Sequence, residues 1–185
     1  IFKGCKNLKT VKLTGKMKYI PDTMFDGADY LESIVIPDSV TSIKDKSFRG
    51  CKSLKQVSIP KSVTSIGEYA FRDCTALQSI SLPENLTSLG NWVFSGCTAL
   101  NNLIIPSRVK SIGCYAFSGC TSLSNLEIKS GILENTGYYG DGYLFNDCIK
   151  LKTVSLTGDL KSIPADMFEG AEYLETLKIP STVTT

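Results

Sequence analysis

A single internal period governs this sequence. A leucine follows each repeated phenylalanine after six residues, and aliphatic residues follow that leucine after three and five residues. The phenylalanines recur every 23 residues, with one step of 28, at Phe2, Phe25, Phe48, Phe71, Phe94, Phe117, Phe145 and Phe168. A unit this small cannot bury its own apolar residues, so the units must stack on one another. The period therefore predicts a solenoid, a coil of stacked rungs.

The pattern inside one repeat predicts two short strands and one helical turn. Residues 54–59 end in the alternation of apolar and polar residues that is typical of a strand with one buried face, and Pro60 follows where that strand should stop. Residues 63–66 indicate a second extended piece, closed by Gly67. Residues 68–74 are polar except for three positions, which predicts one turn of helix.

Two segments carry a resemblance to a known family. IPKSVTSIGEYAFRDCTALQSISLP (59–83) and IPSRVKSIGCYAFSGCTSLSNLEI (105–128) resemble the BspA-like, or treponemal-type, leucine-rich repeat. The resemblance implies a right-handed coil of short parallel strands, with single helical turns and a strand ladder on the concave side. It also implies a place on a bacterial or protist cell surface and adhesion to a host or neighbouring cell. This family offers no catalytic residues to transfer.

We expect residues 1–185 to form one array, with repeats starting at 2, 25, 48, 71, 94, 117, 145 and 168. A longer period is superimposed on the short one, because residues 13–37 and 156–180 match each other better than they match the middle repeats. The chain thus starts and stops within a larger cycle, and neither end shows the polar cap that solenoids need. We expect a fragment of a longer array, or end-to-end association of the fragment itself.

The amino-acid composition limits the kinds of catalytic, metal-binding and partner-binding chemistry expected of this chain. The chain has no histidine, the commonest general base and metal ligand, and its net charge is only +2. Its basic and acidic runs offset each other, and no apolar run approaches the ~20 residues that span a bilayer. We therefore expect no catalytic residue, cofactor or metal, no nucleic-acid partner and no membrane insertion. The chain is not expected to be an enzyme.

Six of the seven cysteines share one place in the repeat, at Cys5, Cys51, Cys74, Cys97, Cys120 and Cys148. Their spacing does not fit a zinc site, and alanine replaces cysteine there at Ala28 and Ala171. We interpret the column as small buried groups rather than as ligands. Cys114 lies outside it, where other repeats carry Glu68 and Asn91, and is predicted to be exposed and reactive.

Two regions are candidates for contact with a partner. The outward residues of the predicted strands are mostly small and uncharged, with Val35 and Ile104 as isolated apolar points. In the middle of this face the candidate residues are Asn102, Ile104, Asn125 and Glu127. The five extra residues before Phe145 form a glycine-rich loop whose candidates are Tyr138, Tyr139, Asp141 and Tyr143. The loop tyrosines either stack on a ligand or fold back onto the coil.

The leading hypothesis is a non-catalytic, extracellular recognition or adhesion module that binds a protein or glycan on a host or neighbouring cell. One alternative is a passive spacer that holds another domain away from the cell. Another is an accessory region of a larger surface enzyme. The ligand is not specified by the sequence.

Overall fold

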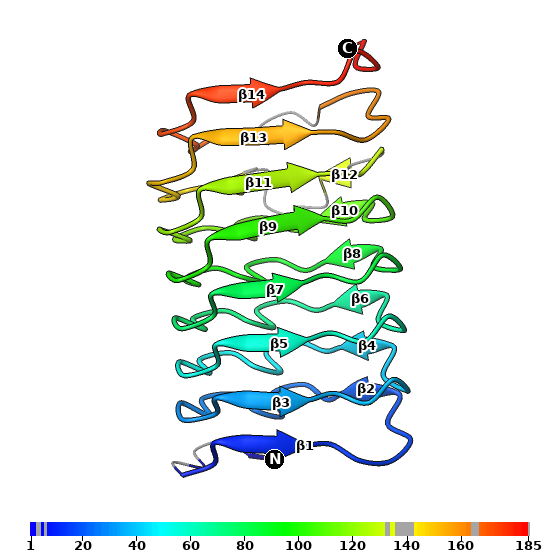
Figure 1. The fold of residues 1–185 in the computed structure, drawn as a ribbon, viewed down its shortest axis with the longest axis vertical. Coiled ribbons are helices and arrows are strands. Elements are labelled where there is room, and N and C mark those ends of the chain that lie inside the picture. Colours follow the sequence, from blue (N-terminus) through cyan, green and yellow to red (C-terminus); the bar gives the residue numbers. More distant parts are fainter. Residues whose placement is uncertain (3–4, 6, 132–133, 136–142, 164–166, 185) are drawn as a thin grey trace.

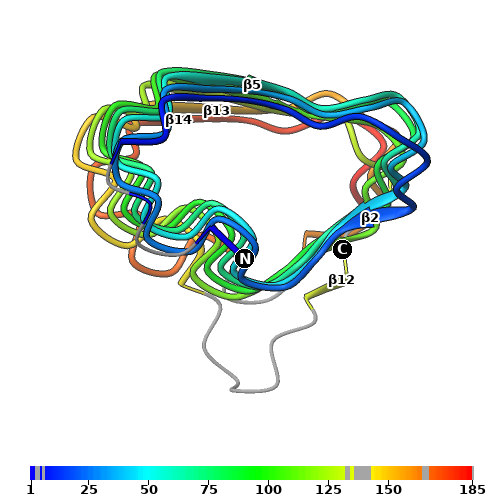
Figure 2. The same ribbon diagram turned by 90° about the horizontal axis from the view of Figure 1, so that it is seen from below.

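A computed structural model describes residues 1–2, 5, 7–131, 134–135, 143–163 and 167–184. The chain winds as a right-handed coil in which each rung adds one parallel strand to a ladder (Figure 1). Seen along the stack, successive rungs lie almost over one another (Figure 2). The predicted solenoid is therefore confirmed.

One side of the coil carries the longer strands. Each pairs in parallel with its equivalent one repeat away, so that Thr10 faces Ser33 and Asn125 faces Thr153 across the 28-residue step. They are hydrogen-bonded as two sheets, β1-β3-β5-β7 and β9-β11-β13-β14. Their bounds are β1 (Thr10–Lys12), β3 (Ser33–Val35), β5 (Gln56–Ser58), β7 (Ser79–Ser81), β9 (Asn102–Ile105), β11 (Asn125–Ile128), β13 (Thr153–Leu156) and β14 (Thr176–Lys178). We call these strands the front ladder.

A second parallel sheet closes the opposite side of the coil. It corresponds to the second extended piece predicted for each repeat. Its six strands are β2 (Tyr19–Ile20), β4 (Ser42–Ile43), β6 (Ser65–Ile66), β8 (Ser88–Leu89), β10 (Ser111–Ile112) and β12 (Glu134–Asn135). We call these strands the back ladder.

The predicted helical turns are wrong. No helix occurs within the described ranges, and residues 68–73 form a run of turns. Tyr69 and Asp73 have φ of 56° and 58°, in the left-handed region, which interrupts a right-handed helix. The amides of Tyr69, Phe71 and Asp73 donate to carbonyls of the next rung at 2.8–2.9 Å. Because these hydrogen bonds connect rungs, they replace the bonds of a helical turn.

The core is a set of identical side chains stacked along the coil axis. Adjacent rings of the phenylalanine column are nearly parallel, with centroids 5.1–6.1 Å apart. From Phe25 to Phe145 the column is completely buried, whereas Phe2 and Phe168 in the outermost rungs are only partly buried. Each ring thus obtains its shielding from the two neighbouring rungs, as expected for a repeat array.

The cysteine column is also part of this core, as predicted. All the cysteines are free thiols, and Cys51 to Cys148 in the column are buried. Each of these donates from Sγ to the carbonyl of a phenylalanine in the preceding rung, as in Cys97 to Phe71 at 3.1 Å. Burial raises the pKa of Cys74, Cys97 and Cys120, and it raises the pKa of Cys148 to about 12. These four thiols are therefore neutral hydrogen-bond donors in the core.

These raised pKa values predict a loss of stability at alkaline pH. The unfolded chain releases its thiol protons near pH ~8.5, while the folded chain retains them. The stabilising contribution is complete below that pH and declines as pH rises toward the folded-state pKa values. We expect the free energy of unfolding to fall by up to ~1.4 kcal/mol per pH unit for each of these four thiols.

The measurement is denaturant unfolding under reducing conditions between pH 8 and 11. Cys97→Ala removes one buried thiol and leaves every lysine and tyrosine in place, so the slope should become shallower by about 1 kcal/mol per pH unit. Equal slopes for the two proteins would contradict this account.

Close contact between rungs requires glycine at one corner of the coil. A Cβ at Gly90 would lie 2.5 Å from the Glu68 nitrogen and 2.5 Å from the Gly67 carbonyl carbon. These are backbone atoms of the preceding rung, which cannot rotate away. Gly131 differs, because the nearest atoms to its Cβ position lie at 3.6 Å, an ordinary contact distance.

We expect Gly90→Ala to destabilise the protein by about 2 kcal/mol or more, because the two rungs must separate locally. Gly131→Ala is the matched control and should change the free energy of unfolding by less than ~0.5 kcal/mol. Urea unfolding of both variants tests the difference. If Gly90→Ala changed the free energy of unfolding as little as Gly131→Ala does, the rungs would not be closely packed at residue 90.

Candidate functional site

The outer face of the front ladder presents the side chains predicted to point outward. In β3, β5 and β7 the middle residue is buried and the flanking residues are exposed. Val35 and Ile104 are 54% and 49% exposed at equivalent places on this face. An exposed aliphatic side chain contributes nothing to the core, so packing does not explain these two residues.

Ile104 lies where two shallow grooves meet. One groove runs over β7 and β9, where Ser81, Glu84 and Lys129 also line it. The other runs over β9, β11, β13 and β14, and Glu127 and Lys178 are among its lining residues. Asn102 and Ile104 belong to both grooves. The surface therefore combines an apolar point with charged and amide groups on either side.

The first groove coincides with the interruption of the front ladder. Among the described strands, β7 ends one sheet and β9 begins the other, although the two lie side by side (Figure 1). The Asn101 amide still donates to the Gln78 carbonyl at 3.3 Å, just before the two strands begin. The loosened pairing at β7 and β9 distinguishes this part of the face from the regular ladder on either side.

Hydrogen bonds hold the polar side chains of the second groove. Asn125 Nδ2 donates to Asn102 Oδ1 at 2.8 Å and to Ser124 Oγ at 3.1 Å. Thr157 Oγ1 donates to Glu127 at 2.9 Å. The structure thus brings Asn102, Ile104, Asn125 and Glu127 together, as their register positions predicted. The fixed amides retain further donor and acceptor capacity for a partner.

The loop candidates are only partly described. Tyr138, Tyr139 and Asp141 lie outside the described residues. Tyr143 is half-buried and stacks on Tyr115, with centroids 5.6 Å apart and an interplanar angle of 27°. For this tyrosine the structure favours the alternative in which the ring folds back onto the coil.

Tyr143 ends an aromatic column that the sequence analysis missed. Tyr69, Trp92 and Tyr115 stack in successive rungs with centroids 5.1 Å apart. Lys46 and Arg72 place cationic groups 5.5 and 5.6 Å from the centre of the Tyr69 ring. The signal is present in the 23-residue period, as an aromatic residue two positions before each of Phe71, Phe94 and Phe117 and again before Phe145.

The backbone at this place in the repeat is left-handed whatever the side chain. Thr23, Lys46, Tyr69, Trp92 and Tyr115 have φ between 51° and 56°. This conformation costs an L-residue about 1–2 kcal/mol. Stacking offsets the cost for the aromatic residues, whereas Thr23 is exposed and lies outside the aromatic column.

We expect Thr23→Gly to stabilise the protein by up to ~1 kcal/mol, because glycine adopts this conformation without strain. Lys61→Gly, at an exposed turn position with ordinary φ, is the control and should lower stability. Thermal or urea unfolding checks the pair. A loss of stability in both variants would be evidence against strain at residue 23.

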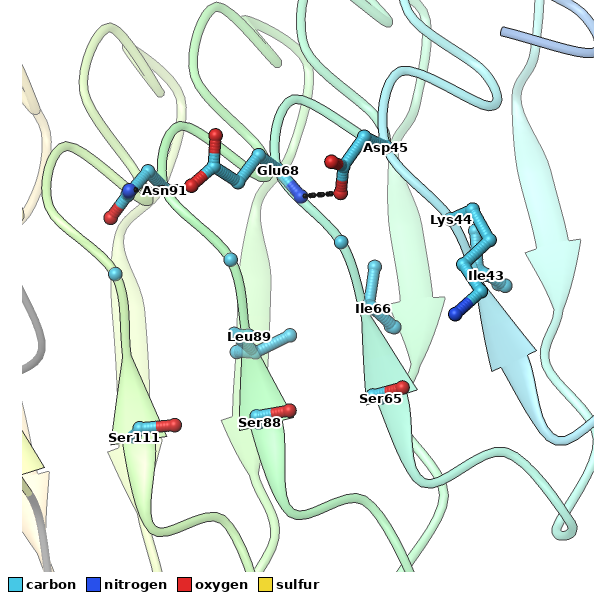
Figure 3. Close-up of a pocket in the computed structure, with 13 residues that line it drawn as sticks. Ile43, Lys44, Asp45, Ser65, Ile66, Glu68, Ser88, Leu89, Asn91 and Ser111 are labelled. Atoms are coloured by element: carbon cyan, nitrogen blue, oxygen red, sulfur yellow. Dashed lines mark hydrogen bonds between the residues drawn. The ribbon is translucent and has the colours of Figure 1, made fainter. Parts of the chain in front are cut away.

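A third groove follows the corner next to the back ladder and is lined by a row of polar side chains (Figure 3). Asp45 Oδ1 accepts the Glu68 amide at 2.8 Å, and Asn91 Nδ2 donates to Glu68 Oε1 at 2.9 Å. Asn91 Oδ1 accepts the amide of Cys114 at 2.9 Å. These groups tie one rung to the next, so their positions are explained by the fold itself.

The prediction that Cys114 is exposed is wrong, because this cysteine is completely buried. Its burial follows from close rung contact, since a Cβ at Gly113 would lie 2.3 Å from the Asn91 nitrogen. Exposure depends on the neighbouring rung as well as on the place in the repeat. The exposed Glu68 and half-buried Asn91 were therefore poor guides to Cys114.

The described residues contain neither a cluster suited to a metal ion nor a helix that could span a membrane. No group of three or more cysteine, aspartate or glutamate side chains in this part of the chain is arranged to hold a metal ion. Within the same ranges there is no helix with the length and apolar character that crossing a bilayer requires.

Comparison with known structures confirms the type of coil. A leucine-rich repeat protein from Bacteroides ovatus superposes with a TM-score of 0.81 and 29% identity, over 95% of this chain and 44% of its own. The T. pallidum leucine-rich repeat protein superposes with a TM-score of 0.67 and 27% identity, over 94% of this chain and 71% of its own. The pneumococcal vaccine antigen PcpA superposes with a TM-score of 0.60 and 26% identity, over 82% of this chain and 35% of its own. The chain thus spans less than half the length of the B. ovatus protein.

Comparison of sequences identifies the family. No curated protein is detectably similar to the chain. The sequence profile of the BspA type leucine-rich repeat region, however, matches residues 1–99, 41–140 and 69–185, which together include every repeat. The chain therefore belongs to the BspA-type leucine-rich repeat family.

Proposed function

We propose that this chain is a non-catalytic recognition module, which binds a protein or glycan partner through the front ladder around Ile104. The observation that carries the proposal is a half-exposed isoleucine where two grooves meet. Binding surfaces combine an apolar centre with a polar rim, and this face has both.

The neighbouring side chains support the same conclusion. Asn102 and Asn125 are joined amide to amide, so their orientation is set before a partner arrives. Preorganised groups lose less conformational entropy on binding than mobile ones. Glu127 and Lys178 line the same groove and offer charges of both signs. A peptide backbone or a sugar hydroxyl is the kind of group that paired amides recognise.

We further propose an extracellular location on the cell surface. The similarity to the pneumococcal vaccine antigen PcpA supports this, as does membership of a family of repeat proteins. The sequence has no histidine, the commonest general base, and this supports a non-enzymatic role.

The test is binding of the purified chain to arrays of glycans and extracellular-matrix proteins, followed by titration of any hit. We expect Ile104→Ser to weaken binding about tenfold to a hundredfold, because an aliphatic side chain that becomes buried contributes about 1.5–3 kcal/mol. An Asn102→Ala/Asn125→Ala variant should also weaken binding, since it removes the paired amides.

Val35→Ser is the matched control, because Val35 occupies the equivalent place on β3 and is similarly exposed. It should leave the affinity unchanged. Equal losses at residues 35 and 104 would contradict a site centred on Ile104. Loss only in a Tyr138→Ala/Tyr139→Ala variant would move the site to the inserted loop. No binding by the unmodified chain would favour the spacer function.

A further inference from the structure

A cavity lies where the chain turns from the front ladder toward the back ladder, between the rung that contains β9 and the rung that contains β11. It has a volume of about 450 Å³, within the usual range for a ligand site. Arg108 and Lys110 line it together with Ser107, Ser130 and Gly131. We call it the corner cavity. The recognition site described above does not include it.

The corner cavity continues the groove that runs over β7 and β9. Pro106 and Lys129 line that groove beside Ile104. Ser107 and Ser130, the next residue in each segment, line the corner cavity. The two depressions therefore follow one another along the same two rungs, from the apolar point at Ile104 around the corner of the coil.

The fold does not require an arginine at position 108. In the three preceding rungs this place in the repeat holds a small polar side chain that donates to a carbonyl of the rung before it. These side chains are Ser39, Ser62 and Asn85, with donor–acceptor distances of 2.6–3.3 Å. Arg108 instead donates from Nη1 to Asn85 Oδ1 at 3.2 Å. Most N–H donors of its guanidinium are therefore not used within the described chain.

Lys129 also departs from its place in the repeat. The four preceding rungs have proline there, at Pro37, Pro60, Pro83 and Pro106. The Lys129 amide makes an inter-rung hydrogen bond that proline cannot make, to the Ile105 carbonyl at 3.0 Å. That bond requires only a backbone N–H, so it does not explain the charged side chain.

The cations at this corner are not neutralised within the described chain. Arg108, Lys110 and Lys129 form no ion pair with a described carboxylate, whereas other lysines and arginines pair at 2.6–3.4 Å. Among the described residues that line the groove or the corner cavity, Glu84 is the one carboxylate. This described lining therefore carries three positive charges and one negative charge, and it complements an anion.

We propose that the ligand of the recognition site is an acidic glycan, whose carboxylate or sulfate group is bound by Arg108 and Lys129. This inference rests on the proposed recognition function and specifies the class of its ligand. A guanidinium binds such oxyanions through two parallel hydrogen bonds, and the Lys129 ammonium supplies a second positive charge. Gly131, at the place equivalent to Arg108 in the next rung, has no side chain to fill the cavity.

The lining favours a glycan over an acidic peptide. Protein partners are usually held by several apolar or aromatic residues at the centre of the interface. In the described lining of the two grooves and the corner cavity, Ile104 is the one exposed large apolar side chain. The other exposed groups are charges, hydroxyls and the paired amides of Asn102 and Asn125. Such groups match the hydroxyls of a sugar.

The test is titration of the purified chain with three chondroitin oligosaccharides of equal length. One is sulfated, one is unsulfated, and the third is unsulfated with its carboxyl groups reduced, so that it is neutral. We expect the neutral form to bind about tenfold more weakly than the better acidic form, because the charge-assisted hydrogen bonds are lost. The two acidic forms distinguish sulfate from carboxylate as the bound group. Affinity for the acidic form should also fall severalfold between ~0.1 M and ~1 M salt, because the screening length decreases from about 10 Å to about 3 Å.

Arg108→Gln/Lys129→Gln should weaken binding of the acidic form about tenfold and leave binding of the neutral form unchanged. Arg108→Lys/Lys129→Arg keeps both charges and should retain most of the affinity. The matched control is Lys55→Gln/Lys150→Gln, which removes the same charge from residues that precede β5 and β13, whereas Arg108 and Lys129 follow β9 and β11. It should change neither affinity. Circular dichroism confirms that each variant is folded.

Equal affinities for the neutral and acidic forms would overturn the inference, as would equal losses in the glutamine variant and the control, or no binding of either acidic form. Tighter, Arg108-dependent binding of a polyglutamate peptide would assign the cavity to an acidic protein and would also overturn it. Ile104→Ser separates this outcome from failure of the recognition site. If it weakens binding of a neutral ligand from the arrays, the recognition function stands even where the acidic-glycan inference fails.

Discussion

The hydrogen bond from one rung to the next is the interaction on which this structure depends. Along much of the described coil, amides on the front ladder, on the back ladder and in the turns around the phenylalanines donate to a neighbouring rung. The alternate amides of 69–73 illustrate the point, because they leave the local turn to reach carbonyls one repeat later. Backbone groups are satisfied between repeats, so the repeat has no stable fold of its own.

This dependence explains why equivalent residues behave alike. Stacked rungs place the same column of side chains at nearly constant spacing, and the phenylalanine, cysteine and aromatic columns all result. It also explains the glycine at the corner, where a Cβ at Gly90 would touch the backbone of the rung before it. Charge follows the same geometry: an acidic residue has its nearest partner 23 residues away rather than three or four, as Asp26 and Arg49 show.

Features that depend on repetition could be predicted from the sequence, and features set by local backbone geometry could not. The strands, the buried columns and the outward position of Ile104 follow from a pattern repeated eight times. The helical turn expected at 68–74 does not form, because Tyr69 has a left-handed φ. This conformation could not be predicted from residue type, since lysine, tyrosine, tryptophan and threonine all occupy that place in the repeat. The prediction that Cys114 is exposed was wrong for a related reason, since the burial of this residue depends on contact with Asn91 in the adjacent rung.

The candidate site was predictable as a set of residues but not as a surface. The register of the strands places Asn102, Ile104, Asn125 and Glu127 together, and the structure agrees. The interruption between β7 and β9 has no sequence signal, yet it forms one of the two grooves that meet at Ile104.

A solenoid separates the requirements of folding from those of binding. Inward positions are restricted to a few residue types because each must match the rungs on both sides, while outward positions are not restricted by packing. An outward residue that departs from its row is therefore informative in a way that a core residue is not. Val35 and Ile104 both depart from a row of polar residues, but only Ile104 lies beside an interruption of the ladder. The combination of an unrequired apolar side chain and an irregular backbone is the physical reason to place recognition there.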